Sequence, residues 1–441
     1  MSSHRRDFLR VASGLSASTA VLLWAHSVDS SENWCESDFI VTNLQRKFSL
    51  PHPLYEANSA WRQSTASAGL KEPQSEYIHE MFCLLKGHRQ NFCNLNSDDF
   101  TIPIFEATPS SESDVPLDLK TYDGESWQTS TLRCQQVETG GRFAVKGIPR
   151  PAGVIRPSGP KCRDADGHMV LVDTVKALEY NFWAATTLVD DQKNSLGGGF
   201  EANAIQFAGA IERFSLRGPG AQTPDPDCRV RNSARATGVP LLAGLLVPED
   251  FQNGGEMTHA MAFAIPRLRH IHPATNESPR DYVYPATKSE TSHYTASPWA
   301  MGAGERIRLR ETIIDQDGNA IKECDLSPAA QRYVKALRTY GAYLVDGSGA
   351  FSFYAEDCRT GNLNLGLDEF NTLCRRPVSE ALPEEKSQWQ VLVETLYEDF
   401  RAIPFAVRKE GRLVSNFDFI TDAVPPAGFE PVCGPAEIND L

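Results

Sequence analysis

Short apolar segments, interrupted by proline, glycine and polar turns, fill the middle of the chain and predict β-strands. Many of their residues are β-branched or aromatic, which suits a pleated surface. Strand follows strand without a convincing long helix between them. The pattern therefore favours a mainly β protein, an antiparallel β-sandwich of the jelly-roll kind, over an α/β sheet. The expected strands cover residues 102–105, 143–148, 167–173, 178–184, 239–247, 259–265, 282–284 and 307–309.

Two segments show the spacing of amphipathic helices instead. Residues 328–340 follow Ser327, a favourable cap, and precede Gly341, and residues 384–400 place their apolar side chains on one face. The mature chain is thus expected to comprise an irregular to helical segment, a β-sandwich core and a helical, cysteine-containing C-terminal extension, over residues 28–100, 101–355 and 356–441.

The first residues resemble an export signal. Arg5 and Arg6, followed by the stretch 7–10, are typical of a twin-arginine signal peptide, and the apolar residues 11–25 are too few and too polar for a membrane span. Small side chains before residue 28 place the cleavage site after Ser27. An ordinary amphipathic N-terminal helix is the alternative. We expect residues 1–27 to be removed and the protein to be secreted or periplasmic, with no membrane attachment afterwards.

Composition and charge narrow the class of protein. The chain has 441 residues, of which 41% are hydrophobic and 23% charged, and this suits a folded core of substantial size. Its formal net charge of -14 argues against broad nucleic-acid binding, which needs a basic surface.

The cysteines agree with export. All 10 lie beyond residue 34, and an even number in an exported chain predicts disulfide bonds. Local spacing favours the pairs Cys83–Cys93 and Cys358–Cys374, although connectivity cannot be deduced from sequence alone. The sequence contains no Cys-x-x-Cys motif, so zinc ribbons and thioredoxin-type redox sites have no support.

Four stretches in the centre of the chain carry a family resemblance. They are residues 166–170, 179–183, 238–245 with 259–264, and 336–346. Their combination resembles a family of secreted bacterial proteins of unassigned function, common in actinobacteria and soil bacteria, over about residues 55–355. The resemblance implies secretion and a shared fold, and it implies no particular chemistry.

Two histidines at the starts of predicted strands are the first candidates for chemistry. If His168 and His259 entered adjacent strands from the same end, they would converge on one cleft. A neutral imidazole transfers protons or binds metals, so we expect an acid/base pair. No cofactor is predicted, but a divalent metal held by both histidines and a carboxylate stays open. The alternative is that each histidine is structural and bonds a loop carbonyl.

A carboxylate, an amide and an indole share one face of the strand at 178–184. Glu179, Asn181 and Trp183 alternate along it, so that polar groups could hold sugar hydroxyls while the indole stacks on the ring. Glu179 would serve as the carboxylate partner of the histidines, since glycoside hydrolysis uses paired acid and base groups. The alternative is a strand with one polar face in solvent.

Basic side chains supply a further set of candidates. Arg308 alternates with apolar residues between Arg306 and Arg310, and Arg267 begins a second basic cluster after Pro266. Such groups would hold a uronate, and Tyr284 would act beside them in a lyase. The alternative is a solvated strand face that is paired with acids. The acidic net charge also opposes long-range attraction of polyanions.

Together these features predict a secreted protein that acts on an extracellular carbohydrate polymer. The favoured activity is hydrolysis or elimination, with His168, His259 and Glu179 as catalytic groups. Substrate would be bound by Asn181, Trp183, Arg267, Tyr284 and Arg308. A non-catalytic protein that binds a glycan or cell wall is the alternative, and a purely structural secreted protein is a third.

Overall fold

The computed structural model describes the greater part of the chain beyond residue 43. It covers residues 44–87, 91–96, 100–107, 167–183, 185, 211–221, 234–270, 281–289, 294–375 and 386–421. For residues 118–122, 127–129, 136–139, 142–145, 207–208, 210 and 253 only the backbone is described. The expected signal peptide, residues 1–27, lies outside the described residues.

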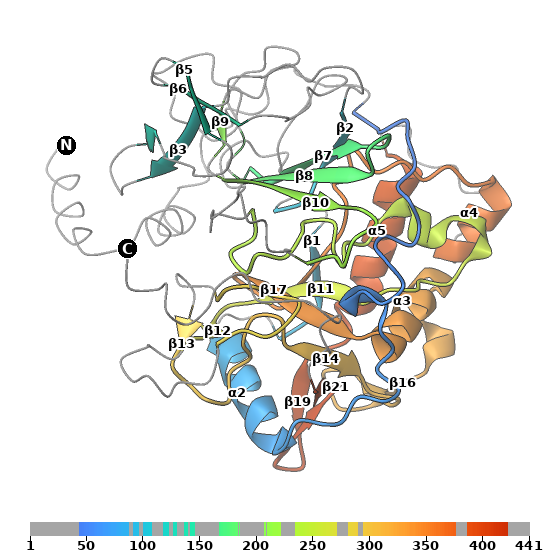
Figure 1. The fold of residues 1–441 in the computed structure, drawn as a ribbon. Coiled ribbons are helices and arrows are strands. Elements are labelled where there is room, and N and C mark those ends of the chain that lie inside the picture. Colours follow the sequence, from blue (N-terminus) through green and yellow to red (C-terminus); the bar gives the residue numbers. More distant parts are fainter. Residues whose placement is uncertain are drawn as a thin grey trace, which may run out of the picture.

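A six-stranded sheet forms the centre of the molecule (Figure 1). Its order is β1-β18-β11-β17-β14-β21, and the pairs β1/β18 and β11/β17 are parallel while the other pairs are antiparallel. The prediction of a mainly β protein is confirmed, but this sheet is mixed rather than antiparallel. Its strands are β1 (Asn94–Asn96), β11 (Met261–Ile265), β14 (Arg306–Leu309), β17 (Ala342–Gly347), β18 (Ser352–Tyr354) and β21 (Phe417–Ile420).

A four-stranded sheet of order β10-β8-β7-β2 lies above it in Figure 1. Here β7 and β8 form the antiparallel pair expected from the sequence, and β2 adds to β7 in parallel. The sheet is buried on both sides, because Val170 and Val172 of β7 pack into the main core while Met169 and Leu171 pack into a second cluster. The strands are β2 (Ile104–Glu106), β7 (Met169–Asp173), β8 (Leu178–Trp183) and β10 (Ala210–Ser215).

The other strands form short ribbons at the periphery. β12 (Leu268–Arg269) pairs with β13 (Tyr294–Thr295), β15 (Ile313–Ile314) with β16 (Ala320–Ile321), and β19 (Ala406–Lys409) with β20 (Arg412–Ser415). A further ribbon joins β4 (Trp127–Thr129), β3 (Asp118–Tyr122) and β9 (Phe207–Ala208), and another joins β5 (Gln136–Thr139) to β6 (Arg142–Val145).

Both predicted helices are present. α3 (Pro328–Thr339) begins where the Ser327 side chain accepts a hydrogen bond from the Ala330 backbone, and α5 (Gln388–Phe400) begins at a similar Ser387 cap. α3, α4 and α5 gather on one side of the six-stranded sheet, and α2 lies near β20 and β21 (Figure 1). The remaining helical elements are η1 (Ala60–Arg62), α2 (Gln74–Gly87), η2 (Pro248–Gly254), η3 (Glu323–Asp325) and α4 (Leu367–Cys374). None of the helices in the described part of the chain has the length and apolar character needed to cross a membrane.

The strand predicted over residues 239–247 is wrong. This segment is a buried succession of tight turns, in which Ala243 donates to the Pro240 carbonyl and Leu245 to the Leu242 carbonyl. Gly244 has φ of 69° and lies against Ala262, where an added Cβ would be 2.4 Å from the Ala262 nitrogen. A fully apolar run is buried in either conformation, so hydrophobicity did not distinguish them.

One hydrophobic core crosses the predicted segment boundaries. Leu95, Phe263, Phe353 and Phe417 belong to the same cluster, although the sequence places them in three different segments. The six-stranded sheet likewise takes β1 from residues 28–100 and β21 from residues 356–441. The expected boundaries near 100 and 355 therefore run through one sheet.

Neither predicted pair, Cys83–Cys93 or Cys358–Cys374, is joined by a disulfide bond in the described part of the chain. Cys83 lies exposed on α2 with its sulfur 3.7 Å from His79, whereas Cys93 is buried in the core. A disulfide requires the two Cβ atoms to lie within about 4.5 Å of each other, a condition that spacing along the chain does not guarantee.

Candidate functional site

The two candidate histidines belong to different sheets. His168 precedes β7 of the four-stranded sheet, and His259 lies two residues before β11 of the six-stranded sheet. The expectation that they enter adjacent strands is therefore wrong. His168 is 5% exposed, and its Nε2 lies 2.8 Å from the Ala234 carbonyl oxygen. This contact is the structural bond to a loop carbonyl that was the alternative interpretation.

His259 is paired with Asp250. Its Nε2 lies 2.8 Å from Asp250 Oδ1, and its Nδ1 lies 3.0 Å from the Ala260 carbonyl oxygen. Both neighbours accept hydrogen bonds, so both ring nitrogens act as donors when both bonds form, and the imidazole is then positively charged. Burial lowers the pKa of His259, but the Asp250 charge and the two hydrogen bonds outweigh it and the pKa is raised.

Both ring nitrogens of His259 therefore already lie within hydrogen-bonding distance of a protein oxygen. His52 lies beside the pair, with its Nε2 3.8 Å from Asp250 Oδ1 and its ring edge-on to that of His259. In the described part of the chain no group of three or more His, Cys, Asp or Glu side chains is arranged to hold a metal ion.

Glu179 and Asn181 do lie together, as strand alternation predicted, but on a buried face. Both are fully buried, and Asn181 Nδ2 donates to Glu179 Oε2 over 3.1 Å. Tyr55 donates its hydroxyl to the other oxygen of Glu179 over 2.6 Å, and the backbone nitrogens of Leu241 and Leu242 donate to Asn181 and Glu179. The pair thus joins β8 to the turns at 239–247 rather than facing an open surface.

Burial controls the charge of Glu179. It raises the pKa of this carboxyl to about 7, against the opposing effect of the hydrogen bonds from Tyr55, Asn181 and Leu242. Trp183, the third residue of the same alternation, is half-buried and packs against the main core. The expected sugar-stacking platform is therefore partly covered.

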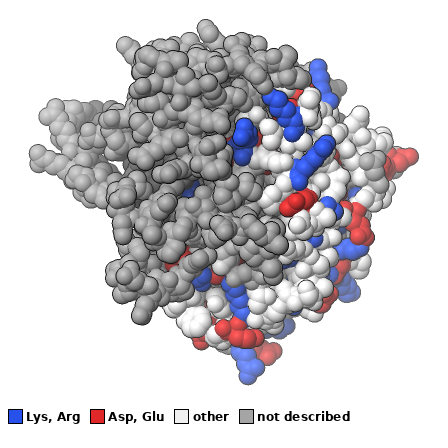
Figure 2. Space-filling model, viewed as in Figure 1, with Lys and Arg blue, Asp and Glu red and all other residues white. Residues whose placement is uncertain are grey.

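The predicted basic groups are mostly engaged within the protein. Arg308 Nε lies 3.5 Å and Arg310 Nε 2.6 Å from Asp418, while Arg306 is buried and donates to the Tyr340 carbonyl. Tyr284 is also buried, which raises the pKa of its hydroxyl to about 12. Of the predicted substrate-binding residues, Arg267 is exposed. Basic and acidic side chains are interspersed over the described part of the face in Figure 2.

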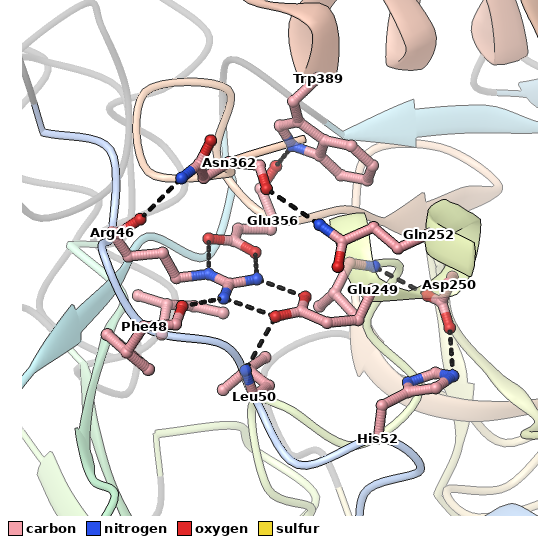
Figure 3. A network of polar contacts seen from close by, with 12 residues as sticks. Arg46, Phe48, Leu50, His52, Glu249, Asp250, Gln252, Glu356, Asn362 and Trp389 are labelled. Carbon is pink, nitrogen blue, oxygen red and sulfur yellow. Dashed lines mark hydrogen bonds and ion pairs between the residues drawn. The ribbon is translucent and has the colours of Figure 1, made fainter. Parts of the chain in front are cut away.

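A buried charge network that sequence reasoning missed lies beside Asp250 (Figure 3). Arg46 donates from Nη2 to Glu249 over 2.5 Å and from Nε to Glu356 over 2.8 Å, and all three side chains are almost completely buried. Glu249 also accepts from the Leu50 backbone, and Trp389 donates to the Glu356 carbonyl. Burial raises the pKa of Glu356 to about 7, despite the stabilising charge of Arg46. The network thus links residues 46–50 to η2 and to the residues that follow β18.

One signal in the sequence could have indicated this network. Glu249 and Glu356 each follow an apolar run directly, at a position where the chain is still inside the core. A charged residue there needs a buried partner of opposite sign. The sequence does not indicate that this partner is Arg46, because the three residues come from distant parts of the chain.

An open pocket of about 560 Å³ is lined by none of the predicted site residues. Three segments form it: the chain around β1, the turn between β15 and β16, and the C-terminal end of α5. Two aromatic rings in its lining, Phe92 and Tyr397, are each 36% exposed. The polar groups that line it include Asn94, Asp315, Asp317, Glu398 and Arg401.

The polar side of the pocket has a fixed geometry. Asp315 Oδ1 accepts hydrogen bonds from the backbone nitrogens of Asp317 and Asn319 over 2.9 and 2.8 Å, and these bonds lower the pKa of Asp315. On the opposite side, Arg401 lies 5.9 Å from the centre of the Tyr397 ring and 3.4 Å from Glu398. The pocket thus combines exposed rings with carboxylates, an amide and a guanidinium.

Comparison of the chain with protein-family models, with curated proteins and with solved structures gave no match in any of the three.

Proposed function

We propose that the protein binds an extracellular glycan, with the pocket at Phe92 and Tyr397 as its binding site. The observation that carries this proposal is the pairing of two exposed rings with hydrogen-bonding side chains in one open pocket. A sugar ring has an apolar face that stacks on an aromatic ring, and its hydroxyl groups bond to carboxylates and amides. The expected export signal supports an extracellular polymer or cell-wall glycan as the ligand.

Binding without cleavage fits the charged groups better than hydrolysis or elimination does. Glu179 and His168 are buried, and His259 is held by Asp250, so these three groups are engaged inside the protein. Within the pocket, the hydrogen bonds to Asp315 favour its ionised form, whereas a glycosidase needs one carboxylic acid that is protonated near neutral pH.

We also propose that the two largest sheets pack face to face as a β-sandwich that supports the pocket. Val170 and Val172 of the four-stranded sheet share a core cluster with Phe263 and Ile307 of the six-stranded sheet, which supports this arrangement.

Replacing Tyr397 by Ala should weaken glycan binding by about tenfold or more, because it removes one stacking ring from the pocket. The mature protein would first be tested on a glycan array, and the affinity of both proteins for the best ligand would then be measured by calorimetry. Phe92→Ala should have a similar effect.

The matched control is Tyr294→Ala, which removes a ring that is 40% exposed outside the pocket lining and should leave the affinity unchanged. Equal affinity of wild type and Tyr397→Ala would overturn the assignment of the pocket. New reducing or unsaturated chain ends in the incubation would show cleavage and would replace the binding proposal by an enzymatic one.

A further inference from the structure

The pocket lining carries more acidic than basic side chains. If the proposed function holds, this charge balance determines which class of glycan the pocket binds. Asp315, Asp317 and Glu398 contribute three carboxylates to the lining, and Arg401 contributes the cation. Arg401 lies 3.4 Å from Glu398, and Asp315 and Asp317 are the other two carboxylates of the lining. Lys409 lies beside the same turn, where it donates to the Gly318 carbonyl, so two cations stand against three carboxylates and one negative charge is left in excess.

The backbone adds to this negative potential. Tyr397 and Glu398 belong to the last turn of α5, a helix of 13 residues, and Arg401 is its C-terminal cap. The carbonyl groups at a helix C-terminus carry the negative end of the helix dipole and favour a cation nearby. The site is the cavity itself, and both its carboxylates and its helix end favour a positive ligand.

The aromatic rings act in the same direction. The face of an aromatic ring attracts a cation, and Arg401 already lies over one side of the Tyr397 ring. Phe92 offers a second exposed aromatic ring. A ligand that carries an ammonium group next to a sugar ring would use the stacking surface and the carboxylates together.

We propose that the pocket selects glycans that carry protonated primary amines, that is, polymers of unacetylated amino sugars, over N-acetylated and uronate polymers. The basic strand face that suggested a uronate ligand does not oppose this, because Arg308 and Arg310 are both paired with Asp418. Asp317 is the residue of choice for a test. Its side chain is exposed, whereas that of Asp315 holds the turn.

The test measures calorimetric affinities for oligomers of glucosamine, N-acetylglucosamine and galacturonic acid of equal length at low salt. The glucosamine oligomer should bind about tenfold more tightly than the acetylated one, and about 0.5 M salt should reduce this preference. Asp317→Asn should reduce the preference by about threefold or more, because it removes one carboxylate charge from the lining and keeps a side chain that can form hydrogen bonds. Glu369→Gln, an exposed acid on α4 outside the pocket lining, is the matched control.

The outcomes separate the two proposals. Equal affinity for acetylated and unacetylated oligomers, both lost in Tyr397→Ala, would overturn the amine preference and leave glycan binding intact. Tighter binding of the galacturonate oligomer would overturn the amine preference as well. Absence of binding to every oligomer and to the glycan array would overturn both proposals.

Discussion

Replacing Arg46 by Met should destabilise the folded protein by about 3–5 kcal/mol, because it leaves two buried carboxylates without their cation. Glu249 and Glu356 have side chains that are 6% and 0% exposed, and Arg46 bonds to both. The Leu50 nitrogen and the Thr360 hydroxyl remain as partners, but neither carries a charge. Urea unfolding at pH 7, followed by tryptophan fluorescence, measures the change in the free energy of unfolding.

The pH dependence of the free energy of unfolding identifies why Arg46→Met is less stable than wild type. Without Arg46 the Glu356 carboxyl favours the protonated form more strongly in the folded state, so the deficit of Arg46→Met should shrink as the pH falls towards 5. Adding Glu249→Gln and Glu356→Gln to Arg46→Met should recover part of the stability at pH 7, because no buried charge is then left. A deficit that is the same at pH 5 and pH 8 would instead assign the effect to lost packing of the Arg46 side chain.

The elements that the sequence predicted well are those with a local signal. β7 and β8 alternate around a tight turn, and α3 has a serine cap, helical spacing and a glycine after its end. The pairing of β11 with β17 in parallel was not predictable in this way. A crossover containing α3 connects the two strands, and alternation within a strand carries no information about its neighbour.

The candidate site was predictable only in part, for a similar reason. Alternation correctly placed Glu179 and Asn181 on one face, since a hydrogen bond joins them. It did not indicate that this face would be covered by Tyr55 and by the turns at 239–247. The pocket brings together residues as distant in sequence as Phe92, Asp315 and Tyr397, and no spacing rule connects these.

Replacing Glu179 by Gln should make the protein more stable than wild type above pH 7, by up to about 3 kcal/mol. Burial raises the pKa of Glu179 to about 7 from an ordinary value of 4.5, so the folded protein holds this proton more tightly than the unfolded chain does. The stability that Glu179 contributes is therefore fully present below about pH 4.5 and is lost as the pH rises to about 7. Glutamine has nearly the same shape and carries no charge, so the variant escapes this loss while keeping partners for Tyr55, Asn181 and Leu242.

The measurement is urea unfolding of wild type and Glu179→Gln at intervals between pH 4 and pH 8. As the pH rises across this range, the free energy of unfolding of Glu179→Gln should increase relative to that of wild type. A substitution at an exposed carboxylate, Glu256→Gln, should produce no such pH-dependent difference. Parallel curves for wild type and Glu179→Gln would mean that the buried carboxyl is not a source of pH sensitivity. Unchanged glycan affinity in Glu179→Gln would place this residue in the supporting fold, whereas lost affinity would return it to the binding site that strand alternation first suggested.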